Sequence, residues 1–149
     1  MSLEQRINED IKAAMLAKEK EKLNALRAVK AAILLLKTSE GNVEITEEIE
    51  INLLQKLAKQ RRDAAELYKN QNREDLYQEE IEQLEFISQY LPEQLSEEDI
   101  ANVLQTLIAE NNLSGMKDMG KLMGLASKKM AGKADNKIIS EIVKKILQP

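Results

Sequence analysis

Apolar residues recur at spacings of three and four along almost the whole chain, and no run of strict apolar and polar alternation appears. A repeat of about 3.6 residues is typical of an amphipathic α-helix, whereas a half-buried strand repeats every two residues. We count seven such segments, separated where polar residues, Gly or Pro gather. The sequence therefore predicts an all-α fold.

Most of the predicted helices begin after a side chain that can accept a hydrogen bond from the first-turn amides. The first also has a glutamine three residues after its serine, which is the pattern of a capping box. The predicted N-caps are Ser2, Thr46, Asn72, Ser96, Ser114 and Asp135.

Pro92 is the only proline inside the body of the chain. A proline in a helix interior removes a backbone hydrogen bond, so a helix is expected to end before it. Long amphipathic segments precede Pro92 and shorter ones follow it. We therefore predict two helical subdomains, residues 1–92 with long helices and residues 93–149 with a small bundle of short helices.

The chain has no His and no Cys. Thiol nucleophiles, Ser-His-Asp triads, disulfides and Cys/His zinc sites are thereby excluded. The carboxylates are scattered around their helices, so we expect no catalytic residue, no metal and no cofactor. No apolar run approaches the roughly 20 residues of a membrane span, and no apolar segment typical of a secretory signal stands near residue 1. These features favour a cytoplasmic protein with no membrane association.

The formal charge of −4 hides an uneven distribution. Residues 93–110 carry five carboxylates and no Lys or Arg, which gives −5, whereas residues 111–149 carry eight lysines and three carboxylates, which gives +5. A basic terminal quarter in an acidic chain indicates an anionic partner. The alternative is that these lysines form the solvated faces of short helices.

Within the basic quarter, Gly120 and Gly124 lie four residues apart inside a predicted helix, where each costs about 1 kcal/mol relative to Ala. Close approach of another backbone, or of a phosphate or sugar, would explain them. Met116, Met119, Met123 and Met130 form a stripe on the same helix, which fits either a core or an adaptable binding groove.

A tight corner is predicted at Gly132 and Asp135, because Gly suits a left-handed helix end and Asp suits an N-cap. Four lysines crowd this corner, and together with the first amides of the last helix they would suit a phosphate. These lysines are Lys128, Lys129, Lys133 and Lys137.

Three strings resemble the YqeY proteins of the GatB/YqeY group: Lys59-Gln60-Arg61-Arg62, the segment 90–98 with Tyr-Leu-Pro-x-Gln-Leu, and the segment 116–135 with Met-Lys-Asp-Met-Gly-Lys. The resemblance covers essentially the whole chain. It implies an all-helical protein whose C-terminal part is similar to the tail of the B subunit of the tRNA-dependent amidotransferase. The tail pattern is met by Gly120, Gly124, Gly132, Lys133, Ala134 and Asp135, and the departure is Asn136, where Pro is frequent.

The basic quarter and this resemblance together predict a non-catalytic module that binds tRNA or a tRNA–protein complex. Lys128, Lys129, Lys133 and Lys137 would contact phosphate, Gly120 and Gly124 would allow close approach, and Gly132 with Asp135 would shape the corner. One alternative is a component of a carbon–nitrogen ligase that uses glutamine as amido-N-donor, which the resemblance implies. Another is a protein-interaction module whose Met-rich helix binds a partner helix.

Overall fold

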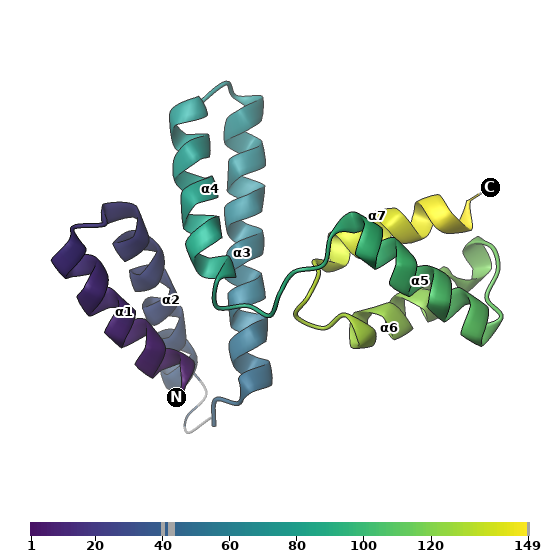
Figure 1. Ribbon diagram of the computed structural model, residues 1–149, viewed down its shortest axis with the longest axis horizontal. Coiled ribbons are helices and arrows are strands. Elements are labelled where there is room, and N and C mark those ends of the chain that lie inside the picture. Colours follow the sequence, from purple (N-terminus) through teal and green to yellow (C-terminus); the bar gives the residue numbers. More distant parts are fainter. Residues whose placement is uncertain (40, 42–43, 149) are drawn as a thin grey trace. The chain divides into compact units, whose positions relative to one another are not determined.

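The computed structural model describes residues 1–39, 41 and 44–148, and within them the regular structure is entirely helical (Figure 1). The prediction of an all-α fold is confirmed. The helices are α1 (Leu3–Ala17), α2 (Lys20–Ser39), α3 (Glu47–Asn70), α4 (Glu74–Ser88), α5 (Glu97–Asn111), the 3₁₀ turn η1 (Met116–Asp118), α6 (Met119–Lys129) and α7 (Asn136–Leu147).

Four of the predicted N-caps are confirmed. Ser2 and Ser96 each form a reciprocal capping box with the residue three positions later. The Thr46 side chain accepts from the amide of Ile49, and the Asp135 side chain accepts from the amide of Lys137. These caps depend only on residues within one turn, which is why the sequence pattern identifies them.

Asn72 and Ser114 do not cap helices, so these two predictions are wrong. Asn72 has a φ of 58° and ends α3, because its amide bonds to the carbonyl of Lys69 and the next amide, of Arg73, bonds to that of Tyr68. This pair of bonds is the Schellman motif, in which Asn tolerates the left-handed conformation.

At Ser114 the expected cap is reversed, since its amide donates to the Asp118 carboxylate at 2.8 Å. Gly115, with a φ of 71°, turns the chain into η1, and α6 begins only at Met119. The helix also ends earlier than predicted, at Lys129 and not at Gly132. The Met-rich segment is therefore a 3₁₀ turn followed by a short helix.

The chain divides into two compact units, Met1–Leu91 and Pro92–Pro149. In unit 1, α3 and α4 lie side by side as an antiparallel hairpin, α1 packs on α2, and α2 packs on α4 more extensively than on α3 (Figure 1). The Tyr90 hydroxyl donates to the Asp10 carboxylate, and the Arg6 guanidinium lies 5.1 Å from the centre of the Tyr90 ring. These contacts hold the chain that leaves α4 against α1.

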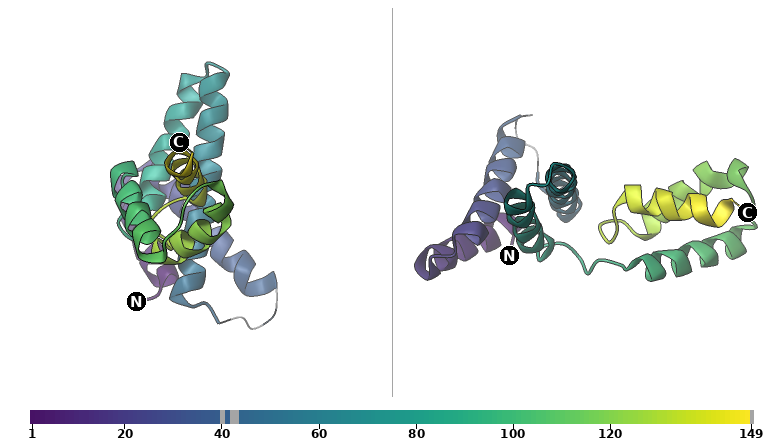
Figure 2. Two further views of the ribbon diagram at one scale, coloured as in Figure 1. Left: turned by 90° about the vertical axis from the view of Figure 1, so that its right-hand side faces the viewer. Right: turned by 90° about the horizontal axis from the view of Figure 1, so that it is seen from above.

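Unit 2 is a bundle of α5, α6 and α7, seen from two further directions in Figure 2. Its core is a cluster of buried hydrophobic side chains: Ile100, Leu104, Leu107, Leu113, Leu122, Ala126, Met130, Ala134, Ile139, Val143 and Leu147. Because the apolar stripe of each short helix is used in this core, the polar and basic side chains of the three helices lie on the outside.

No helix among the described residues combines the length and the apolar character needed to cross a bilayer.

Candidate functional site

Backbone hydrogen bonds and a left-handed glycine define the corner between α6 and α7. Gly132 adopts a φ of 77°, as the sequence predicts for a left-handed helix end. The Lys133 amide donates to the carbonyl of Met130 at 2.9 Å, and Ala134 is buried. The Lys133 side chain therefore extends from a backbone that its own amide hydrogen bond and the buried Ala134 fix in place.

The segment before α5 clamps this corner. The Gln94 side-chain amide donates to the carbonyl of Gly132 at 2.8 Å, and the Leu95 backbone amide donates to the carbonyl of Lys133 at 2.9 Å. Two strings that carry the family resemblance thus meet in space. Nothing in the sequence indicated this role of Gln94, because the residues it joins are far apart along the chain.

Asp135 changes the chemistry expected at the start of α7. Its carboxylate accepts from the Lys137 amide at 3.1 Å and so lies at the positive end of the helix dipole. A phosphate placed on the same amides would meet this negative charge. The Lys137 amide is therefore already bonded within the chain.

Gly120 and Gly124 are exposed on α6, and a Cβ built at either position meets no heavy atom within 4 Å. The explanation by close packing of another part of this chain is therefore wrong within the described residues. Both have ordinary helical backbone, so no unusual φ requires Gly either. At the two glycines the surface of α6 therefore has no side chains and is open to solvent.

Lys128 follows Gly124 by four residues, so it lies on the same face of α6 as both glycines. Lys121 lies at the edge of this face, three residues before Gly124, and both lysines are exposed. We call Gly120, Lys121, Gly124 and Lys128 the glycine–lysine face. Lys121 was not among the predicted site residues, although its spacing from Lys128 could have revealed it.

The other predicted lysines surround the corner. Lys129 points about 100° around the helix axis from Lys128, since an α-helix has about 3.6 residues per turn. Lys133 lies in the corner itself and Lys137 in the first turn of α7, and all three are exposed. None of the four predicted lysines makes an ion pair with another described residue.

The methionine stripe is mainly part of the core. Met130 is buried, and Met119 and Met123 pack against the unit 2 core, whereas Met116 is exposed. Three of the four side chains are therefore used in packing, which leaves little of the stripe for a partner.

In the part of the chain that the structure describes, no three His, Cys, Asp or Glu side chains are grouped so that they could hold a metal ion.

The chain matches the model of the family YqeY, described as Yqey-like protein, over residues 4–147. This range includes both units.

Two proteins with established names are similar to the chain. "Altered inheritance of mitochondria protein 41, mitochondrial" from Pyrenophora tritici-repentis is 29% identical over 146 residues, which cover 95% of this chain and 79% of that protein. The E subunit of glutamyl-tRNA(Gln) amidotransferase from Thermococcus sibiricus is 38% identical over 58 residues, which cover 36% of this chain and 9% of that protein. The second similarity is thus confined to a short segment of a much longer protein.

Proposed function

The chain belongs to the Yqey-like protein family, and we propose that it is a non-catalytic helical module that binds tRNA, or a complex of tRNA with protein, through unit 2. The segment shared with an amidotransferase subunit whose name specifies a tRNA supports this proposal. So does the charge of residues 111–149, which is +5 in a chain of net charge −4.

The observation that carries the proposal is the glycine–lysine face. With no side chain at Gly120 and Gly124, a sugar–phosphate backbone can lie against the helix, while the ammonium groups of Lys121 and Lys128 reach phosphate oxygens from the adjoining edge of the same face. Close approach strengthens the attraction between lysine and phosphate, because the Coulomb energy of opposite charges becomes more favourable as their distance falls.

The corner adds a second group of phosphate contacts. Lys129, Lys133 and Lys137 are exposed around a backbone that Gln94 and Leu95 hold in place. We assign Gly132 and Asp135 a shaping role, since Gly132 is buried and the Asp135 carboxylate would repel a phosphate. The acidic residues 93–110 would keep nucleic acid away from the neighbouring surface of α5.

The test is binding of bulk tRNA to the full chain, measured by gel shift at several salt concentrations. Neutralised phosphates release counterions, so the logarithm of the binding constant should fall linearly with the logarithm of salt concentration. Negligible binding at low salt would overturn the proposal.

Charge reversal locates the surface. The double variant Lys128→Glu/Lys133→Glu should lower the salt slope by about 1 for each lysine–phosphate pair that it removes. The matched control is Lys12→Glu/Lys20→Glu in unit 1, which makes the same change in net charge at exposed positions. If the control weakens binding as much as the double variant does, binding reflects net charge and the assignment to unit 2 is wrong.

The named similarity to an amidotransferase subunit favours one second candidate, a component of a carbon–nitrogen ligase that uses glutamine as amido-N-donor. We expect no amidated product when the chain alone is incubated with glutamine, ATP and misacylated tRNA, because the similarity covers only 9% of the amidotransferase subunit. Formation of product would replace the binding proposal with this one.

We also propose a cytoplasmic location. The fungal relative is named as a mitochondrial protein, so fractionation of cells that express the full-length gene product is the relevant measurement. Recovery from an organelle would contradict the proposal.

A further inference from the structure

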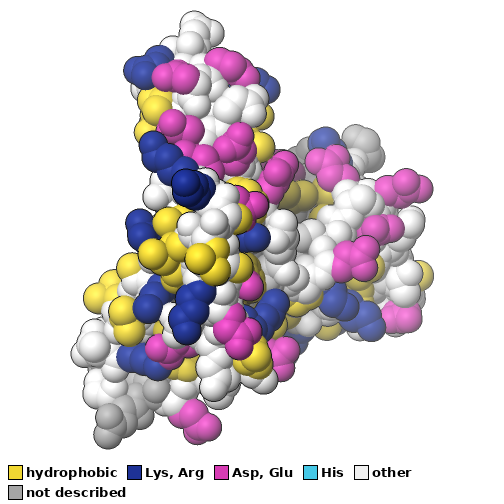
Figure 3. All heavy atoms as spheres, turned by 60° about the vertical axis from the view of Figure 1, so that its left-hand side comes forward, with side chains coloured by type: hydrophobic (Ala, Val, Ile, Leu, Met, Phe, Trp, Pro, Cys, Tyr) yellow, Lys and Arg dark blue, Asp and Glu magenta, His cyan; other side chains and the backbone are white. Residues whose placement is uncertain are grey.

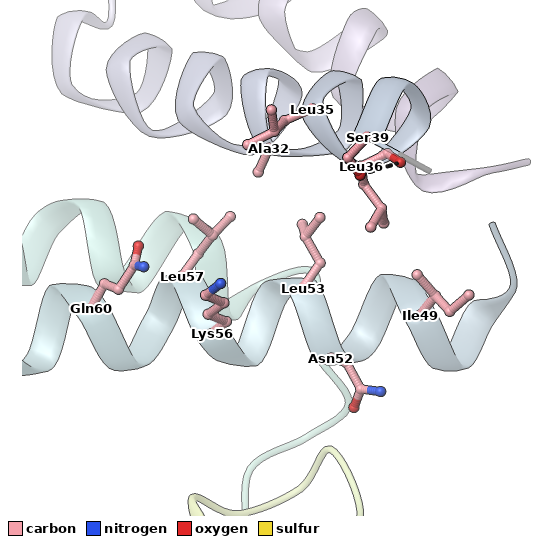
Figure 4. Close-up of a pocket in the computed structure, with 10 residues that line it drawn as sticks. All are labelled: Ala32, Leu35, Leu36, Ser39, Ile49, Asn52, Leu53, Lys56, Leu57 and Gln60. Carbon is pink, nitrogen blue, oxygen red and sulfur yellow. Dashed lines mark hydrogen bonds between the residues drawn. The ribbon is translucent and has the colours of Figure 1, made fainter. Parts of the chain in front are cut away.

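An apolar groove of about 640 Å³ runs between α2 and α3 in unit 1 (Figure 4). The side chains of Ile49, Leu53 and Leu57 project from α3 toward α2 in this view. The opposite wall is formed by aliphatic side chains of α2, namely Ala32, Leu35 and Leu36. The groove exists because α2 packs mainly on α1 and α4, which leaves its side toward α3 only partly covered.

The groove leaves large hydrophobic side chains open to water. Leu35, which lines the groove, is 69% exposed, and its chain neighbour Leu34, outside the lining, is 45% exposed. Figure 3 shows one face of the molecule on which hydrophobic side chains gather in patches with Lys and Arg side chains beside them. Contiguous apolar surface bordered by polar groups is typical of interaction sites.

The charge of the groove selects the chemistry of its occupant. Among the described residues that line the groove, Lys56 is the only charged one, and the polar residues are otherwise neutral. Lys56 is exposed and makes no ion pair with another described residue. An occupant with a carboxylate near Lys56 is therefore favoured over one with a cation there.

The same charge argues against a second copy of the chain as the occupant. A symmetric pair through this groove would bring the two Lys56 side chains to one interface, and none of the described lining residues supplies a carboxylate to separate them. Like charges at an interface disfavour the pairing.

We propose that this groove binds an amphipathic helix of a partner protein, with an aliphatic stripe against α2 and α3 and a carboxylate beside the stripe facing Lys56. The α3 wall covers residues 49–60, which is about three helical turns at about 1.5 Å per residue. A helix with apolar residues at i, i+3 or i+4, and i+7 fits such a length. This site is separate from the tRNA surface proposed for unit 2.

The probe is a fluorescein-labelled synthetic helical peptide of about 18 residues, with Leu at helical spacings and Glu flanking the stripe. Its anisotropy is measured against the full chain, beside a peptide in which Lys replaces every flanking Glu. We expect the Glu peptide to bind at least about tenfold more tightly, which corresponds to about 1.4 kcal/mol. Lys56→Glu should reverse this preference.

Leu35→Gln should weaken the Glu peptide at least about tenfold, by placing an amide in the apolar contact. Leu16→Gln is the matched control, because Leu16 is 86% exposed in the last turn of α1, outside the groove. Both leucines are exposed, so neither change threatens the fold, and far-ultraviolet circular dichroism verifies this.

Equal binding of the two peptides, or equal loss with Leu16→Gln and Leu35→Gln, would overturn the proposal. Self-association in sedimentation that Leu35→Gln abolishes would also overturn it, because a second copy of the chain would then occupy the groove. So would binding of a fluorescent fatty acid without binding of the Glu peptide.

Discussion

Replacing Gly120 and Gly124 by Ala should stabilise the protein and weaken its binding to tRNA. Gly124 lies inside α6, where Gly costs about 1 kcal/mol relative to Ala, whereas Gly120 lies in the first turn and should gain less. Neither new Cβ would meet a heavy atom within 4 Å. The double variant should therefore gain about 1–2 kcal/mol. In a domain of roughly 60–100 residues, each 1 kcal/mol raises the Tm by about 4–8 °C.

The assay is thermal unfolding of the full chain by circular dichroism, with hydrogen exchange of the α6 amides to locate the gain in unit 2. Gly115→Ala is the matched control. A Cβ at Gly115 also meets nothing, but its φ of 71° with a ψ of 172° lies in a region that essentially only Gly adopts, so Ala should cost about 1–3 kcal/mol there. Comparing the variants thereby separates the effect of space for a Cβ from the effect of backbone conformation.

Two results would refute the reasoning. A lower Tm for Gly120→Ala/Gly124→Ala would mean that the glycines are packed, contrary to the open helix face. A higher Tm with unchanged affinity for tRNA would agree with an open helix face. It would also show that this face does not contact phosphate.

The remaining predictions concern stability. Gln94→Ala should cost about 1 kcal/mol through loss of its hydrogen bond to the corner, and Gln105→Ala, at an exposed position of α5, should leave chemical denaturation unchanged. Ser96→Ala should cost about 1 kcal/mol through loss of a capping box, whereas Ser114→Ala should be nearly neutral, because only the Ser114 backbone amide is used. Burial raises the pKa of the Tyr90 hydroxyl, and the hydrogen bond to its carboxylate partner raises it further. Above pH of about 10 the unfolded chain therefore loses a proton that the folded chain keeps. The free energy of unfolding should fall as pH rises there, and less steeply in Tyr90→Phe; equal slopes would contradict this assignment.

The positions of the helices could be predicted from the sequence because their determinants are local. The apolar repeat, the capping boxes at Ser2 and Ser96 and the cap at Asp135 each involve residues within about one turn. The two wrong caps show the limit of the same information. Asn72 suits both a helix start and a left-handed helix end, and the hydrogen bonds of the α3–α4 turn decide between them.

The candidate site was predicted in part. The basic composition of residues 111–149 identified the lysines, and Gly132 has the left-handed backbone that its position suggested. Which lysines share a face depends on where the short helix α6 starts and ends, and residues 116–118 form a 3₁₀ turn that helical spacing alone does not indicate.

By itself, the sequence determined a helical chain without the side chains of thiol, triad or zinc chemistry, with a basic segment after residue 110. Only the tertiary structure decided that Gln94 clamps the corner, that Gly120 and Gly124 meet no neighbour, and that α2 and α3 leave an apolar groove between them. The physical reason is the separation along the chain of the residues that determine each feature. A helix is selected by hydrogen bonds between residues four apart, whereas a clamp, an open face and a groove depend on which distant segments pack and which do not.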